Sequence, residues 1–411
     1  MRLSAYTSLR TARVPVAVLG TYPPRACGIA TFTRHLATAL EAGGDVRPCV
    51  VAVTEVRSAA CRELDGLVVF EIEQDRESDY AEAARVLSRA GIAAVNIQHE
   101  YGIFGGRWGR MLLTFLGDLD VPVVTTLHTV LPSPDREVQR LTRAIADRSA
   151  VLIVMAASAV RILRDDYGVA PGKVLVIPHG IPDGPYLDAP EAKRMTGLKG
   201  RTVLTTFGLI GPGKGLEYAI RALPRILAHD PSTLYLIVGQ THPAVIRQEG
   251  ERYRTRLQAL AEDMGVAHAV RFDNRYRAEP EILTTLAATD VYLTPYVNPA
   301  QITSGTLTYA VGSGCPVVST PFTYAQELIT PDHGLLVLFR DADAIADAVI
   351  SLLGDPARRA AITAACCRLR GSLRWSSVAR SYARLFEAVT HPLVTPAAAS
   401  RRMLGPVASA G

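Results

Sequence analysis

Two short segments in the second half of the chain could together bind a diphosphate. The first, Gly208–Gly215, follows the apolar run Val203–Phe207 and contains Gly213, Lys214 and Gly215. The second, Gln301–Thr306, follows Asp290–Pro295 and ends in Ser304-Gly305-Thr306, immediately before a helical pattern. Free backbone N–H groups at helix starts attract anions, and an ammonium group or hydroxyls strengthen the site. Each segment also has a simpler explanation. The first could be an ordinary turn with a solvated lysine, and the second could be a helix N-cap made by Ser304 or Thr306.

Three polar residues in the first half follow apolar runs in the same way. His128 directly follows the apolar run Val123–Leu127, and His99 and Glu100 directly follow Val95–Gln98. Parallel strands deliver such residues to the edge of a sheet where ligands bind, although a lone histidine is more often structural. His179 borders an expected linker, which favours a structural role.

A loop after the first apolar run carries another candidate anion contact. It reads Gly20-Thr21-Tyr22-Pro23-Pro24-Arg25-Ala26-Cys27-Gly28-Ile29-Ala30. Arg25 could meet an anionic acceptor or a phosphate, and a rigid Pro-Pro connector with a surface arginine is the simpler alternative.

Several other chemistries lack their motifs. No Ser or Thr follows Lys214, so the magnesium-binding phosphate loop of nucleoside triphosphatases is not expected. There is no HExxH motif or Cys/His cluster, which disfavours a protein-bound metal. There is no GxSxG motif of a nucleophilic serine. No GxGxxG motif follows the first strand, which disfavours a dehydrogenase.

Composition indicates a globular chain without nucleic-acid partners. Its 411 residues exceed one ordinary core, so two domains are expected. The net charge of +5 is modest and no basic block is interleaved with aromatic residues. None of the six cysteines forms a CxxC pair, and no signal peptide is evident. No apolar run approaches the roughly 20 residues of a membrane span. We therefore expect a cytoplasmic protein.

Short apolar runs alternate with helical patterns along the chain, which predicts parallel sheets covered on both faces. The expected strands are 16–19, 92–97, 121–127, 151–154 and 174–177 in the first half, and 203–207, 234–238, 270–272, 291–293 and 316–319 in the second. One-sided apolar stripes predict helices after Gly28 and after Lys214. The Pro- and Gly-rich segment 182–201 is expected to be a linker. Two Rossmann-like halves would leave a ligand cleft between the carboxyl ends of their strands.

The chain resembles the retaining glycosyltransferases of family 4, which have the GT-B fold. The matching pieces are Gly28-Ile29-Ala30, the strand ending in His128, Val151–Val154 with Ser158, Val176–Ile181, Gly213-Lys214-Gly215, Asp290-Val291, Gly314–Ser319 and Trp375–Ala379. The resemblance implies a first domain over 1–185, a nucleotide-sugar domain over 200–372, and a C-terminal helix over 375–392 that crosses back to the first domain. Residues 393–411 are expected to be a disordered tail.

The chain departs from the family pattern at three positions. The paired-glutamate motif of the family, Glu-x7-Glu, falls on Gln301 and Tyr309, and the arginine beside the phosphate-binding lysine falls on Leu209. In the family the second glutamate usually holds the nucleotide ribose. Ser304, Thr306 and Tyr309 could partly substitute through neutral hydrogen bonds, which are weaker than charge-assisted ones.

The resemblance assigns roles to the remaining candidates. Lys214 would neutralise the β-phosphate, His128 would border the sugar, and Glu327 could accept its hydroxyls. The donor would be bound by Gly213, Gly215, Gln301, Ser304, Gly305, Thr306 and Tyr309, and the acceptor side would be formed by Arg25, Gly28, Ile29, Ala30, His99 and Glu100.

The expected function is retaining transfer of a mannosyl or glucosyl group, in carbohydrate biosynthesis. The donor would be a nucleoside diphosphate sugar of the GDP-mannose or UDP-glucose type, the acceptor a hydroxyl of a sugar, lipid or small molecule, and no cofactor would be required. Contact with a membrane surface stays open. One alternative is a catalytically impaired partner subunit that binds a sugar or nucleotide, and another is a different GT-B enzyme such as an epimerase or a phosphorylase.

Overall fold

The computed structural model describes residues 13–56 and 66–390 of the chain. Residues 1–12 of the expected first domain, Cys61, and the expected tail 393–411 lie outside the described residues.

The first half of the chain forms a parallel sheet, which has seven strands within the described residues, in the order β3-β2-β1-β4-β5-β6-β7. Their bounds are β1 Val14–Thr21, β2 Val46–Thr54, β3 Val68–Glu73, β4 Ala94–His99, β5 Val123–Leu127, β6 Val151–Val154 and β7 Val174–Val176. Strands β2 and β3 were not predicted. Strand β2 contains Arg47 and Pro48, which are atypical of an internal strand, and β3 includes two glutamates.

The second half forms another parallel sheet, in the order β10-β9-β8-β11-β12-β13. Its described strands are β8 Thr202–Phe207, β9 Thr233–Val238, β10 Val270–Asp273, β11 Val291–Thr294, β12 Val317–Ser319 and β13 Gly334–Leu336. Strand β13 was not predicted, because its three residues begin with a glycine, which is atypical of strands.

Helices connect the strands of both sheets. In the first half they are α1 Gly28–Gly43, α3 Glu77–Arg89, α4 Leu112–Gly117, α5 Arg136–Arg148 and α6 Ala157–Tyr167. In the second half they are α7 Ala189–Met195, α8 Leu216–His229, α9 Pro243–Glu249, α10 Arg252–Asp263, α11 Glu279–Ala287, α12 Gly305–Ser313, α13 Thr323–Leu328, α14 Ala342–Gly354, α15 Pro356–Leu373 and α16 Trp375–Thr390. Helix α7 lies inside the expected linker, so that prediction was wrong there; Asp188 caps it, and Ala192 joins a cluster with Val203 and Leu234.

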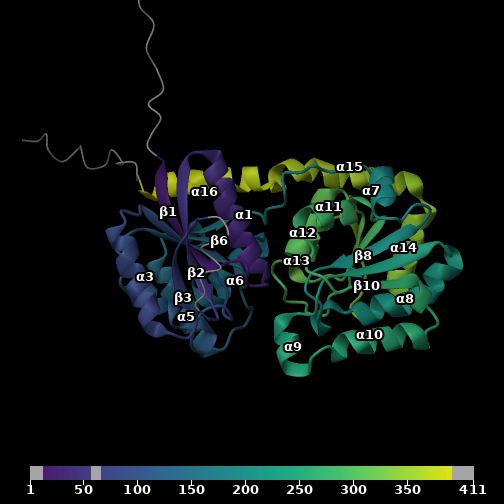
Figure 1. Cartoon of the computed structure of the whole chain (residues 1–411), viewed down its shortest axis with the longest axis horizontal. Helices are drawn as coiled ribbons and strands as arrows, with labels where there is room; N and C mark the ends of the chain where they lie inside the picture. Colours follow the sequence, from purple (N-terminus) through teal and green to yellow (C-terminus); the bar gives the residue numbers. More distant parts are fainter. Residues whose placement is uncertain (1–12, 57–65, 391–411) are drawn as a thin grey trace, which may run out of the picture.

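The last two helices tie the domains together. Helix α15 lies along the second domain, whereas α16 returns to the first, as the two yellow helices show in Figure 1. Trp375, Tyr382 and Phe386 of α16 are buried with Phe32 and Leu36 of α1. The predicted GT-B architecture is therefore confirmed, including the returning helix. Among the described residues, no helix combines the length and apolar character that a bilayer crossing requires.

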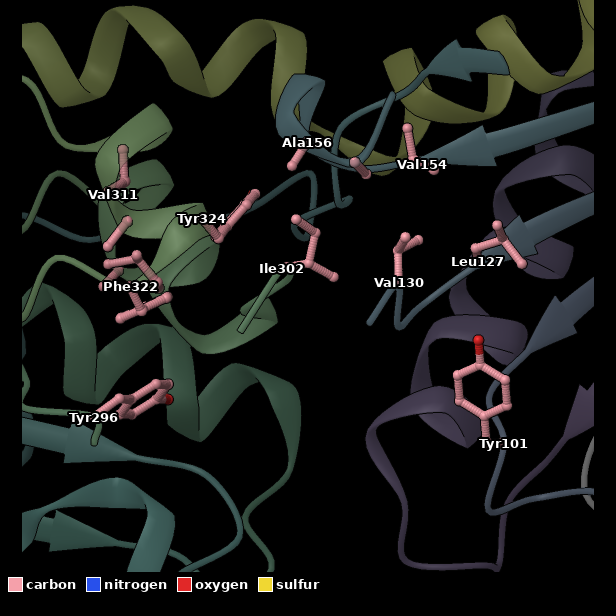
Figure 2. Packing of buried hydrophobic residues seen from close by; sticks show 14 of the residues in the cluster. Tyr101, Leu127, Val130, Val154, Ala156, Tyr296, Ile302, Val311, Phe322 and Tyr324 are labelled. Carbon is pink, nitrogen blue, oxygen red and sulfur yellow. The ribbon is translucent and has the colours of Figure 1, made fainter. Parts of the chain in front are cut away.

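The two domains also share apolar contacts. One buried cluster contains Val130 and Ala156 of the first domain together with Ile302 and Tyr324 of the second. Figure 2 shows Ile302 in the space between Tyr324 and Val130. This contact holds the carboxyl ends of the two sheets close to each other.

Candidate active site

A cleft of about 380 Å³ lies between the two domains. Helix α1 of the first domain forms one wall, and the segments after β8, β9 and β10 and the start of α12 form the other. The segments that follow parallel strands are where such sheets bind ligands.

The two predicted anion-binding segments meet at this cleft. The Lys214 Nζ donates to the Tyr296 hydroxyl at 2.5 Å, and that hydroxyl lies 2.8 Å from the Thr306 Oγ1. Ser304 caps α12 by accepting from the Leu307 N–H at 3.3 Å, and its Oγ lies 3.3 Å from the Thr306 Oγ1. An ammonium group, hydroxyls and a helix N-terminus therefore converge, which is an arrangement that stabilises an anion.

Tyr296 holds this arrangement together and was not predicted as a site residue. Its ring lies beneath the Lys214 ammonium, 4.1 Å from Nζ to the ring centroid. Burial alone would raise the pKa of Tyr296, but the Lys214 charge and hydrogen bonds from Lys214, Thr306 and Ser304 lower it below its ordinary value. The signal in the sequence is the tyrosine that follows β11, three residues after Leu293.

At two predicted positions, close packing explains why the residue is a glycine. Gly215 has φ +61°, and a Cβ there would lie 2.0 Å from the Pro295 carbonyl oxygen. A Cβ at Gly305 would lie 2.6 Å from the His179 Nε2, so the start of α12 packs directly on that imidazole. His179 also lines the cleft. At Gly213 a Cβ would meet nothing within 4 Å.

The first domain presents one face of α1 to the cleft. Gly28 lines the cleft, and so do Thr31, Phe32, Arg34 and His35, none of which was predicted. Ile29 and Ala30 are not among the lining residues, and Ala30 is fully buried. Arg25 lies away from the cleft, where it donates to the Gln74 Oε1 at 2.9 Å and pairs with Glu55 at 3.6 Å.

His128 is fixed by a chain of buried amides. The Asn96 Nδ2 donates to the Val124 carbonyl oxygen at 3.0 Å, so the Asn96 Oδ1 accepts from the Gln98 Nε2 at 2.5 Å. The Gln98 Oε1 must then accept from the His128 Nε2 at 2.8 Å, which places the imidazole proton on Nε2. Burial lowers the pKa of His128 to about 3, so this imidazole is neutral. His128 does not line the cleft but packs edge-on against Phe32, which does.

His99 is fully buried and Glu100 is half-buried, and neither residue lines the cleft. Neither ring nitrogen of His99 has a hydrogen-bond partner, and burial lowers its pKa to about 4. The Glu100 carboxylate accepts from the Tyr101 N–H at 2.9 Å and from the Thr129 hydroxyl at 2.5 Å. Burial raises the pKa of Glu100, and these hydrogen bonds partly oppose the rise.

The structure places the remaining second-domain candidates at different points. Tyr309 lines the cleft, with its hydroxyl 3.4 Å from the His35 Nδ1. Gln301 lies outside the lining and donates to the Thr303 carbonyl oxygen at 3.1 Å. Glu327 accepts from the Ala157 and Ser158 N–H groups at 2.7 and 2.6 Å, at the start of α6 in the other domain. The structure therefore brings together Lys214, Gly305, Thr306, Tyr309 and Gly28 as cleft-lining candidates.

The segment after β10 contributes charged cleft residues that the sequence reading missed. Arg275, Tyr276, Arg277 and Glu279 all line the cleft. The Asp273 carboxylate accepts hydrogen bonds from both Arg275 and Arg277. These bonds, the one from Arg275 most of all, lower the pKa of Asp273 to about 2, although burial alone would raise it. The available signal was the charge-rich run Asp273–Glu279, which begins at the last residue of strand β10.

Within residues 13–56 and 66–390, no group of three or more His, Cys, Asp or Glu side chains is arranged to hold a metal ion. The cleft instead combines the cations Arg34, Lys214, Arg275 and Arg277 with backbone N–H groups, which suits an anionic ligand.

Two family models match the chain in succession. Residues 26–184 match "Glycosyltransferase Family 4" and residues 201–355 match "Glycosyl transferases group 1". The first match covers strands β2 to β7 of the first domain, and the second covers strands β8 to β13 of the second.

Curated relatives match parts of the chain. A Corynebacterium glutamicum protein named GDP-mannose-dependent monoacylated alpha-(1-6)-phosphatidylinositol monomannoside mannosyltransferase is 34% identical over 163 residues, which are 38% of each chain. A Corynebacterium aurimucosum D-inositol 3-phosphate glycosyltransferase is 26% identical over 309 residues, which are 70% of each chain. The matched segment thus spans little more than a third of the first relative.

The fold is also similar to solved structures. The Anabaena protein Alr3699/HepE, in a complex with UDP and glucose, superposes with a TM-score of 0.72 at 17% identity, over 92% of this chain and 100% of that one.

Proposed function

Because this chain belongs to the family 4 and group 1 glycosyltransferases, we propose that it is a hexosyltransferase that uses a nucleoside diphosphate sugar and retains the anomeric configuration. The observation that carries the proposal is the convergence of Lys214, Thr306 and the start of α12 on one cleft between two nucleotide-binding-type domains.

The proposed chemistry needs little from the protein beyond positioning and charge. As the bond from the sugar to the diphosphate breaks, negative charge develops on the leaving β-phosphate. The Lys214 ammonium and the N–H groups of α12 would stabilise that charge. The acceptor hydroxyl would attack from the same face and give its proton to the leaving diphosphate, so no protein nucleophile is required.

The cleft walls would exclude water, since hydrolysis of the donor competes with transfer. Contacts between α1 and the segment after β10 support this role: the Thr31 Oγ1 lies 2.7 Å from the Tyr276 hydroxyl, and the His35 Nε2 lies 2.9 Å from the Glu279 Oε2. Both pairs join the two domains across the cleft.

GDP-mannose is the first donor to test, because the 34%-identical relative is named as GDP-mannose-dependent. UDP-glucose is the second, since a similar fold binds UDP and glucose. Inositol phosphates and phosphatidylinositol vesicles are the acceptors to test first, because they correspond to the names of the relatives. The five described cysteines are unpaired, which supports a reducing, cytoplasmic setting.

The test is donor turnover by the purified chain. Each donor is incubated with and without each acceptor, and the release of free nucleoside diphosphate and of glycosylated acceptor is measured. Acceptor-dependent release supports transfer, and NMR of the product at the anomeric carbon reports retention or inversion. No turnover with any combination, despite tight nucleotide binding, favours the second candidate.

That second candidate is a partner subunit that binds the nucleotide sugar without turning it over. Gln301 and Tyr309 favour it, because neither motif position carries a carboxylate and Gln301 is engaged with the Thr303 backbone. In that case, nucleotide would raise the melting temperature by mass action while no product forms.

A further inference from the structure

Glu279 has an unusual place in the cleft. Among the residues that the structure describes, it is the one Asp or Glu side chain that lines the cleft, whereas Arg34, Lys214, Arg275 and Arg277 supply positive charge there. A carboxylate is an obligate acceptor of hydrogen bonds when ionised. It would repel the phosphates of a ligand and needs donors such as hydroxyl groups.

The carboxylate of Glu279 lies against the other domain, and its buried Oε2 has no hydrogen-bond partner among the described residues. Its Oε2 lies 2.9 Å from the His35 Nε2 on α1, and the side chain is 33% exposed. It is not used to cap its own helix, because the α11 N-terminus is capped by Glu281, whose Oε2 accepts from the Ala278 N–H at 3.1 Å. Glu279 is therefore oriented toward the cleft and retains acceptor capacity.

A chain of contacts leads from the anion site to Glu279 through Tyr309 and His35. Tyr309 lies three residues after Thr306, about 5 Å further along α12. The Tyr309 hydroxyl contacts one nitrogen of the His35 ring at 3.4 Å, and Glu279 contacts the other nitrogen. The ribose of a nucleoside diphosphate is esterified to the α-phosphate, so a diphosphate bound at Thr306 leaves its ribose next to the anion site, and Tyr309, His35 and Glu279 line the cleft there.

We propose that the Glu279 carboxylate binds the 2′- and 3′-hydroxyls of the nucleotide ribose, and that His35 orients it from the opposite domain. The inference rests on the proposed use of a nucleoside diphosphate donor. A carboxylate suits a vicinal diol, since it can accept both hydroxyl protons at once. The ribose then contacts a residue pair that joins both domains, so nucleotide binding and domain closure are coupled.

The test compares ribonucleotides with their 2′,3′-dideoxy counterparts. GDP, UDP and ADP are titrated into the full chain by calorimetry, and the nucleotide that binds most tightly is compared with its dideoxy form. We expect the wild type to bind the dideoxy form roughly tenfold to a hundredfold more weakly, the range expected for hydrogen bonds to a charged group. In Glu279→Gln this ratio should fall below about threefold, because the charged acceptor is lost.

Glu281→Gln is the matched control. It removes one negative charge from the same helix start, within 4.0 Å of Arg275 and 3.8 Å of Arg277, but it does not line the cleft. It should keep the wild-type ratio even if both affinities change. A wild type that binds both forms equally, or a Glu279→Gln variant that keeps the ratio, overturns the inference alone. A wild type that binds none of the three nucleotides overturns the proposed function together with it.

Discussion

Glu327 accepts a hydrogen bond from the Ser158 N–H at 2.6 Å although the two residues belong to different domains and are separated by 169 positions. The same carboxylate accepts from the Ala157 N–H at 2.7 Å. Helix α6 has no side-chain cap of its own, since its N-cap residue is Ala156. A residue of the second domain therefore accepts hydrogen bonds from the free N–H groups at the start of a helix in the first.

Removing this charge should loosen the contact between the domains. We expect Glu327→Gln to favour separation of the domains by roughly 1 kcal/mol, the size of a partly exposed charge–helix interaction. Small-angle scattering of the ligand-free chain should show a larger radius of gyration. Gln326→Ala is the neighbouring control, because Gln326 bonds only within its own domain, to the Pro321 carbonyl oxygen at 2.5 Å. Equal radii for Glu327→Gln and wild type would contradict the prediction.

Loss of the Lys214 ammonium should impair transfer more than binding. We expect Lys214→Ala to lower kcat by roughly a hundredfold or more, as for removal of one group that stabilises developing negative charge. The assay is initial rate against donor concentration. Lys199→Ala removes an exposed lysine and should leave the rate unchanged. Near-wild-type turnover by Lys214→Ala would remove this residue from the mechanism.

The contact of Gly305 with His179 predicts a rescue. The methyl group of Gly305→Ala would meet the imidazole, which is fixed by a 2.7 Å contact between its Nδ1 and the Gly180 carbonyl oxygen. We expect a loss of about 1–3 kcal/mol and weaker nucleotide binding. His179→Ala should relieve the clash in the double variant, so the two effects are not additive. Gly354→Ala, where a Cβ meets nothing within 4 Å, is the control, and additive effects would argue against the contact.

The buried histidine His99 predicts instability in acid. Because burial lowers its pKa to about 4 from 6.5, the unfolded chain takes up this proton as the pH falls below 6.5 and the folded chain does not. The free energy of unfolding should then decrease between pH 6.5 and 4, by roughly 1.4 kcal/mol per pH unit for one such group, and not above pH 6.5.

Urea titrations at pH 7.5 and 5 measure this effect. His99→Leu should reduce the difference between the two pH values, and it breaks no hydrogen bond because both ring nitrogens are unpartnered. His268→Gln alters an exposed histidine and should retain the wild-type difference. If His99→Leu retains it as well, His99 is not responsible.

Sequence patterns predicted the parts of the fold that repeat. Strands β8 and β11 are apolar runs, each followed by a turn and a helix, and the two predicted anion-binding segments lie between these strands and helices. Strand β2 was missed because Arg47 and Pro48 interrupt its apolar run, while the pairing of β2 with β1 and β3 stabilises it all the same.

The opposing wall of the cleft could not be predicted in the same way. Arg34 and His35 lie on a helix whose apolar stripe identifies only its buried side, and which partner its other residues meet depends on how the domains face each other. The same holds for Glu327, whose position after β12 suggested a ligand contact, whereas its partner is the start of α6.

The chain passes between the domains at two points that touch. Ile181 and Arg374 form an isolated parallel bridge, in which the Ile181 N–H donates to the Leu373 carbonyl oxygen and the Trp375 N–H donates to that of Ile181, each at 2.8 Å. Because the two connections are fastened side by side, we expect them to act as a single hinge between the domains. Opening about this hinge would break the exposed contact between Thr31 and Tyr276 across the cleft, and substrate entry is expected there.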